Sequence, residues 1–187
     1  MKTLKAISIS TLTLATLIFA VLSMTSCNNS SGNEAPEMTI HAATFMGNLK
    51  AVEQHIAAGT ELNATDEYGS TPLIIAATFD KPKIAKALIK GGANMSATGG
   101  DGSTPLHTAA FMCRVEIVKA LLANGADKNL RNNYGSTPLQ SVEANFADVK
   151  PIYEQLNKDL GAAGFRLDYG YLEKTRPLVA EILKTAR

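Results

Sequence analysis

The chain has 187 residues, of which 45% are hydrophobic and 19% are charged, and its formal net charge is +1 at pH 7. The 18 basic residues are nearly balanced by 17 acidic ones, and Lys and Arg are not concentrated in any one block. This argues against nucleic-acid binding, because that binding needs a basic face. Two cysteines are too few for a disulfide framework, even in an oxidising compartment.

Residues 1–26 have the features of a bacterial signal peptide. Lys2 and Lys5 precede a mostly apolar stretch, residues 7–22, and small residues follow up to Cys27. The sequence Met-Thr-Ser-Cys at residues 24–27 resembles a lipobox, the cleavage motif of lipoproteins. The resemblance implies cleavage before Cys27 and lipidation of its sulfur, and two or more acyl chains anchor a protein stably. An ordinary secretory signal and an uncleaved membrane helix are the alternatives.

Residues 27–36 follow as the lipidated Cys and a polar tether, with a composition typical of flexible linkers. The residue after Cys27 is Asn28. In enterobacterial lipoproteins an Asp at this position is a signal for retention at the inner membrane, and Asn28 does not resemble it. The resemblance therefore implies a lipid-anchored protein of the bacterial cell envelope, located at the outer membrane and facing the periplasm.

The rest of the chain is organised around the tripeptide Thr-Pro-Leu, which recurs every 33 residues. It occupies residues 71–73, 104–106 and 137–139, and a Gly-Ser pair precedes each copy. A fixed period of this length is typical of a stacked repeat.

One copy, residues 99–131, shows what each repeat should form. Gly102 predicts a turn, Thr104 a helix N-cap and Pro105 the first position of a short helix. A second, amphipathic helix is predicted to end at Gly125, with apolar residues at helical spacing: Val115, Val118, Leu121 and Leu122. Such a unit cannot bury both helices alone and must stack on its neighbours.

The pattern resembles the ankyrin repeat, with its motif G-x-T-P-L-H-x-A-A and a later L-L-x-x-G-A-D. Residues 102–110 read Gly-Ser-Thr-Pro-Leu-His-Thr-Ala-Ala, and residues 121–127 read Leu-Leu-Ala-Asn-Gly-Ala-Asp. The resemblance covers residues 37–157 and implies an all-α ankyrin-repeat solenoid, made of stacked helix-turn-helix units with β-turn fingers. It also implies a scaffold that binds another protein on its concave face and is not an enzyme.

The predicted repeats depart from the motif at both ends. Repeat 1, residues 37–65, lacks the Thr-Pro pair and serves as an N-terminal cap, and in repeat 4, residues 132–157, Gln140 replaces the motif His. Asp80 and Cys113 occupy the loop between the two helices, where a left-handed backbone suits Asp and should strain Cys. Repeats 2 and 3 are residues 66–98 and 99–131.

Residues 158–187 are predicted to form a helical C-terminal cap, either a worn fifth repeat or an unrelated helical tail. The last helix is predicted to start near Thr175, with Pro177 at its first position. Its inward-facing residues would be Leu178, Ile182 and Leu183.

No pattern in the sequence supports catalysis, a metal, a cofactor or a small-molecule substrate. His41 and His107 stand at the motif His, whose family role is a hydrogen bond between adjacent turns, and His55 is expected to be exposed. No pair of His or Cys has the spacing of metal ligands, and Cys113 has no paired base that would support a redox or catalytic role.

The residues that ankyrin repeats expose on the concave face are rich in aromatic residues and Met here, which favours a protein interface. Alternatively, the Phe and Met side chains pack between repeats or under loops. The predicted partner-binding residues are Phe45, Met46, Tyr68, Phe79, Asp101, Phe111, Met112 and Tyr134.

The sequence thus predicts a membrane-anchored extracytoplasmic scaffold that stabilises or localises an envelope protein. The alternative is an immunity protein that neutralises a periplasmic toxin.

Overall fold

The computed structural model describes residues 35–186. The predicted signal peptide, Cys27 and most of the tether lie outside this range, so their roles stay predictions. Between residues 35 and 186 the regular structure is helical, without β-strands. Within that range, none of the helices combines the length and the apolar character needed to cross a bilayer.

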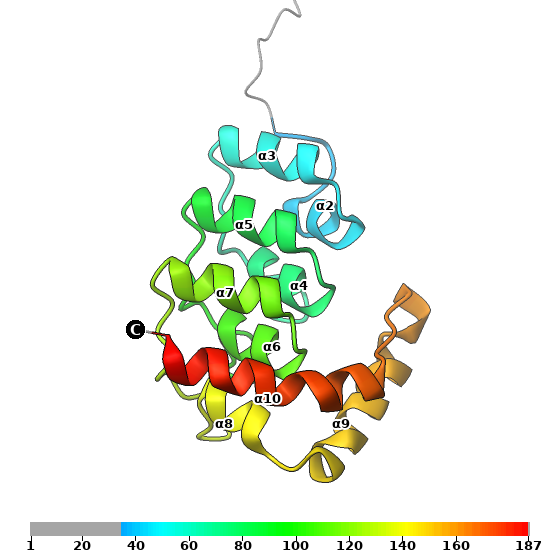
Figure 1. Ribbon diagram of the computed structural model, residues 1–187. Coiled ribbons are helices and arrows are strands. Elements are labelled where there is room, and N and C mark those ends of the chain that lie inside the picture. Colours follow the sequence, from blue (N-terminus) through cyan, green and yellow to red (C-terminus); the bar gives the residue numbers. More distant parts are fainter. Residues whose placement is uncertain (1–34, 187) are drawn as a thin grey trace, which may run out of the picture. The chain divides into compact units, whose positions relative to one another are not determined.

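Three helix pairs follow one another from the start of the described chain. In each pair the first helix has seven residues and the second has nine. The first helices stack in one row, the inner row, and the second helices stack in another, the outer row (Figure 1). The pairs are α2 (Ile40–Met46) with α3 (Leu49–Ala57), α4 (Pro72–Thr78) with α5 (Pro82–Lys90), and α6 (Pro105–Phe111) with α7 (Val115–Ala123).

The recurring Thr-Pro pair starts the inner helices, as predicted. Thr71, Thr104 and Thr137 each accept a hydrogen bond from the backbone N–H three residues later, at 3.3, 3.4 and 3.3 Å. The proline that follows occupies the first helical position, where its missing N–H leaves no bond unmade. The third copy starts α8 (Pro138–Glu143), which continues the inner row. Thr39 provides the same cap for α2.

The predicted turns between repeats are closed by backbone hydrogen bonds. In each finger the first residue donates its N–H to the carbonyl of the fifth, at 3.0, 2.9 and 3.1 Å. The second and third fingers also bond to each other, because Asn133 donates its backbone N–H to the Asp101 carbonyl at 3.0 Å. The fingers are residues 66–70, 99–103 and 132–136.

Left-handed backbone marks the loop between the two helices of each pair. Gly47 has φ of 79°, and the equivalent Asp80 and Cys113 have φ of 52° and 55°. A non-Gly residue in this region is uncommon, and Asp is among the types that tolerate it best. The predicted strain at Cys113 is therefore present in the backbone.

His55 is buried, so the expectation that it is exposed was wrong. Its two ring nitrogens lie 3.0 Å from the Thr60 hydroxyl and 2.8 Å from the Met38 carbonyl. The imidazole thus ties α3 to the start of the described chain and to the loop after α3.

The fourth repeat departs from this plan, because its outer helix comes from the end of the chain. After α8 the chain forms α9 (Phe146–Asp159), a short 3-10 helix η1 (Gly161–Ala163) and α10 (Tyr169–Thr185). It is α10 that packs along α8 and contacts α7, so the outer row runs α3, α5, α7, α10 (Figure 1). Helix α10 thus takes the place of the outer helix of the fourth repeat.

The helix boundaries near the end of the chain differ from the predicted ones. Helix α10 begins at Tyr169, six residues before the predicted Thr175, and Pro177 lies inside it. Leu183 is buried as predicted, but Leu178 is 53% exposed and points away from the core. The sequence pattern predicts the second helix of repeat 4 over residues 148–157, but α9 begins at Phe146 and Pro151 lies inside it.

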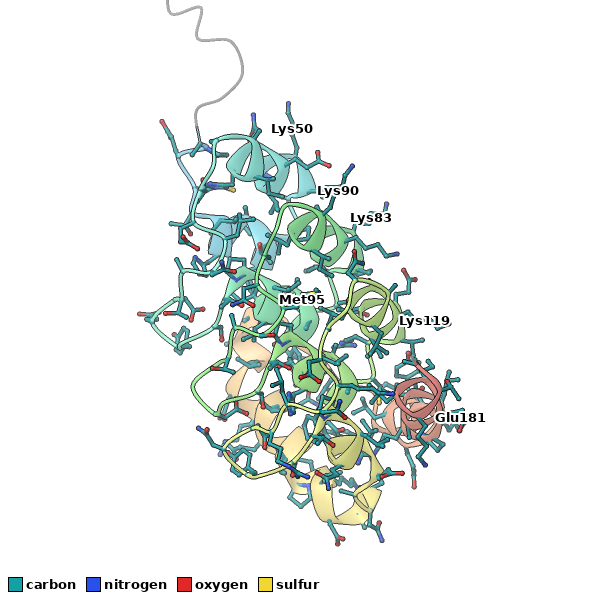
Figure 2. The ribbon with its side chains drawn as sticks, turned by 90° about the vertical axis from the view of Figure 1, so that its left-hand side faces the viewer. Lys50, Lys83, Lys90, Met95, Lys119 and Glu181 are labelled. Atoms are coloured by element: carbon teal, nitrogen blue, oxygen red, sulfur yellow. The ribbon has the colours of Figure 1, made fainter. Side chains whose placement is uncertain are left out.

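The outer row presents charge to the solvent. Figure 2 shows Lys50, Lys83, Lys90 and Lys119 of α3, α5 and α7 pointing away from the stack, and Glu181 of α10 does the same. Among the described residues, α3, α5 and α7 expose none of the large hydrophobic side chains. In α10, by contrast, Tyr171 is 48% exposed and Leu178 is 53% exposed.

Candidate functional site

The segment from α9 through η1 runs past the C-terminal ends of the inner helices and covers part of the predicted apolar stripe. Phe165 packs edge to face against Phe79 with ring centroids 5.6 Å apart, and Phe79 contacts Phe45 in the same way at 4.8 Å. Tyr153 of α9 stacks on Phe111 at 4.5 Å. These contacts form two aromatic clusters, one of Phe45, Phe79 and Phe165 and the other of Phe111, Phe146 and Tyr153.

The predicted stripe is therefore not an open surface at Phe79, Phe111 and Met112. The two Phe rings are partly buried under α9 and Phe165, and Met112 is only 5% exposed. These three side chains follow the alternative, in which they pack inside the fold. Large apolar rings gain more from burial against other rings than from contact with water, which explains the arrangement.

The other predicted contact residues remain on the surface. Tyr68 and Tyr134, at equivalent positions of the first and third fingers, are each 78% exposed. Met46 is 66% exposed, Phe45 is 37% exposed at the end of its aromatic cluster, and Asp101 is exposed on the second finger.

A cleft of about 430 Å³ lies between the last two fingers, the inner helices α6 and α8, and α9. We call it the α9 cleft. Its fingers contribute polar groups, whereas α9 and the end of α6 contribute apolar ones. Its lining includes Asp101, Ser103, Phe111, Met112, Asn132, Tyr134, Gln140, Val149, Ile152 and Leu156.

A buried arginine fixes the α9 wall of this cleft. Arg176 of α10 is 3% exposed and donates to the Tyr153 hydroxyl at 2.7 Å. It also donates to the carbonyls of Ser141 and Ala144, at 3.0 and 2.8 Å. The carbonyl oxygens partly offset the cost of burying the charge, and the arginine connects α10, α9 and the end of α8.

The Tyr153 hydroxyl completes this network. It donates to the Phe111 carbonyl at 2.6 Å while accepting from Arg176. Burial raises the pKa of Tyr153 to about 12, so the hydroxyl keeps its proton near neutral pH. The ring that supports the cleft wall is therefore held by stacking and by two hydrogen bonds.

His107 is among the residues that line the cleft, and both nitrogens of its ring make hydrogen bonds within the protein. Its Nε2 is 2.9 Å from the Ser136 carbonyl of the third finger, and its Nδ1 lies 3.2 Å from the Thr104 amide N–H. This pattern fits the neutral ring with the proton on Nε2, and burial lowers the pKa of His107. The predicted bond between adjacent turns is confirmed here, and His41 makes its equivalent at 2.8 Å to the Ala64 carbonyl.

Gln140 takes the motif His position in the last inner helix. Its side-chain oxygen accepts from the Thr137 amide N–H at 2.9 Å, and Arg131 donates to the same oxygen at 3.0 Å. Because no further finger follows α8, a histidine here would lack the carbonyl that His107 bonds. The glutamine keeps the cap and leaves its side chain on the rim of the cleft.

The described residues contain no candidate metal centre, and their free cysteine is buried. Cys113 is fully buried, and burial raises the pKa of its thiol to about 11, so little thiolate forms near neutral pH. Between residues 35 and 186, no cluster of three His, Cys, Asp or Glu side chains could hold a metal ion.

Residues 40–132 match the family model described as ankyrin repeats, in three copies. These residues are ankyrin repeats. No curated protein matches the chain. Ankyrin repeats are protein-interaction modules and are generally not enzymes, which agrees with the predicted scaffold.

The ankyrin match ends at Asn132, before α8, α9 and α10. The α9 cleft is therefore built jointly by ankyrin repeats and by a segment outside the match. The pattern of the predicted second helix of repeat 4 puts Val149, Ile152 and Leu156 on one face, and the structure places all three in the lining of the cleft. The predicted span of residues 148–157 is close to the nine residues of α3, α5 and α7, so helix length gave no signal, and only the structure extends α9 to 14 residues.

Proposed function

We propose that this protein is a scaffold that binds an envelope protein through its fingers and is anchored to the outer membrane by lipid on Cys27. The observation that carries the binding role is the pair of finger tyrosines. Tyr68 and Tyr134 are each 78% exposed. Exposed tyrosines are typical of protein interfaces, because they offer a large contact area and a hydrogen-bonding group.

The anchoring role rests on the sequence alone. A signal peptide that ends in a lipobox delivers the chain across the inner membrane and leaves lipid at residue 27. The polar tether then separates the ankyrin repeats from the bilayer, and the uncharged Asn28 favours the outer membrane. Because the tether is short, the ankyrin repeats can bind only proteins that are present on the same side of the membrane.

The test of the binding role is capture from detergent-solubilised bacterial envelope with the full-length protein. The wild type should retain a specific protein that a Tyr68→Ala/Tyr134→Ala variant loses, while a Leu178→Ala control, changed at an exposed α10 residue, keeps it. Retention of the same protein by the tyrosine variant would overturn the finger surface as the binding site. A captured nuclease or muramidase would favour the immunity function instead.

The anchor is tested separately with a Cys27→Ser variant. Metabolic labelling with a radioactive fatty acid should mark the wild type and not the variant, and the variant should leave the membrane fraction. Labelling that persists without Cys27 would overturn the proposed anchor.

A further inference from the structure

We propose that the α9 cleft binds an extended segment of the partner protein, in which a large apolar side chain enters between α6 and α9 and a neighbouring Lys or Arg pairs with Asp101. This inference rests on the proposed scaffold function and names what the scaffold recognises. It concerns a site that ankyrin repeats alone do not form, since one wall is α9.

The size of the cleft suits a short segment of chain. Its volume of about 430 Å³ lies within the range of roughly 300–1,000 Å³ typical of sites that enclose a compact ligand. The apolar end is lined by Phe111 and Met112 from the end of α6 and by Val149 from α9. A side chain such as Phe, Leu or Met would lose its contact with water there and leave no polar group without a partner.

The apolar end is held in place before any ligand arrives. Tyr153 stacks on Phe111 and is fixed by Arg176, so the α6 and α9 sides of the cleft are joined by contacts within the protein. A preorganised wall lowers the ordering cost of binding. The cleft is thus better suited to recognise a segment than a loose surface of the same composition.

The charge of the cleft lining determines which residue is favoured next to the apolar side chain of the bound segment. Within the part of the chain that the structure describes, Asp101 is the one charged side chain among the residues that line the cleft. Its carboxylate accepts only from the backbone N–H and hydroxyl of Ser103, at 2.9 and 2.8 Å, which leaves acceptor capacity at the mouth. A cationic side chain complements this end, whereas an acidic one would be repelled.

Two exposed apolar side chains line the cleft, one from a finger and one from α9. Tyr134 comes from the third finger and is 78% exposed, and Ile152 comes from α9 and is 51% exposed. A segment lying along the cleft would contact both of them. Such contacts shield the central anchor from water, as the outer residues of an interface do.

The experiment is selection of displayed random heptapeptides on the full-length protein in detergent micelles. We expect the enriched peptides to share an apolar residue beside a Lys or Arg, and we would measure the affinity of the most enriched one. The Ile152→Ser variant should weaken its binding at least tenfold. The matched control, Leu178→Ser, changes a residue of α10 with 53% exposure and should bind as the wild type does.

Charge recognition is tested with Asp101→Asn, which keeps an oxygen to accept from Ser103. It should weaken binding of the selected peptide several-fold and have no effect on a version of the peptide with Gln in place of the basic residue. Enrichment of acidic or purely apolar peptides, no enrichment at all, or equal binding by the Ile152→Ser variant would each overturn the proposal. Capture of an envelope partner by Ile152→Ser as efficiently as by the wild type would also overturn it, while leaving the scaffold function intact.

Discussion

Tyr153 lies face to face with Phe111, with their ring centroids 4.5 Å apart, and its hydroxyl donates a hydrogen bond to the Phe111 carbonyl oxygen. Through this contact α9 lies along the inner row, where it closes one side of a cleft. Arg176, which donates to the same hydroxyl, adds α10 to the arrangement. The three residues therefore couple the ankyrin repeats to the C-terminal helices.

Removal of the Tyr153 hydroxyl should destabilise the protein strongly for so small a change. Tyr153→Phe leaves one Arg176 donor and the Phe111 carbonyl without their shared partner in a buried site, which we expect to cost about 1–3 kcal/mol. Tyr68→Phe removes a hydroxyl from a side chain that is 78% exposed and should have almost no effect. Urea unfolding followed by circular dichroism measures both, and equal midpoints would contradict the network.

Two leucines of α10 should respond very differently to truncation. Leu183 is 1% exposed within the core, so Leu183→Ala should reduce the free energy of unfolding by about 2–5 kcal/mol. Leu178 is 53% exposed, and Leu178→Ala should change it by roughly 0.5 kcal/mol or less. Similar losses in both variants would mean that α10 does not pack as the outer helix of the fourth repeat.

Gly102 should tolerate a side chain worse than Gly125 does. Both have left-handed backbone, with φ of 74° and 83°, so Ala at either position costs about 1–2 kcal/mol. A Cβ at Gly102 would also lie 2.9 Å from the Asn133 backbone nitrogen, whereas one at Gly125 meets no atom within 4 Å. Thermal or urea unfolding should therefore show that Gly102→Ala is clearly less stable than Gly125→Ala. The reverse order of stability would contradict the finger packing.

Stability should decrease as the pH falls below about 6.5, partly because of His107. Burial lowers the pKa of His107 in the folded state, so in this range the unfolded chain takes up a proton that the folded chain does not. The loss should level off below the lowered pKa. His107→Gln cannot titrate and copies the cap that Gln140 provides, so its unfolding free energy should drop less between about pH 7.5 and pH 5. An equal drop in both proteins would show that His107 contributes nothing to the pH dependence.

The Cys113 thiol should be unreactive in the folded protein. It is completely buried and its pKa is raised to about 11. In a Cys27→Ser background, a thiol-specific chromogenic reagent should react with Cys113 only after addition of denaturant. Rapid reaction with the native protein would reopen a redox role for this residue.

Much of the fold could be predicted from the sequence because its signals are local and repeated. The Thr-Pro caps, the turn glycines and the helix lengths depend on residues within a few positions of one another, and a 33-residue period places them in register. The hydrogen bond from His107 to the next finger follows from the same regularity. The sequence by itself therefore determined the ankyrin stack and the exposure of Tyr68 and Tyr134.

The tertiary structure decided what happens where the period stops. Residues 146–186 contain two amphipathic helices, α9 and α10. By hydrophobic pattern alone, the apolar face of either helix could pack against α7 and α8. The choice depends on contacts distant in sequence, such as Arg176 with Tyr153 and Phe165 with Phe79. Hydrophobic burial is not directional, so the pattern shows which faces are buried but not which partner covers them. For that reason Phe79 and Phe111 were expected on an open surface, and only the folded chain reveals the cleft that α9 forms beside them.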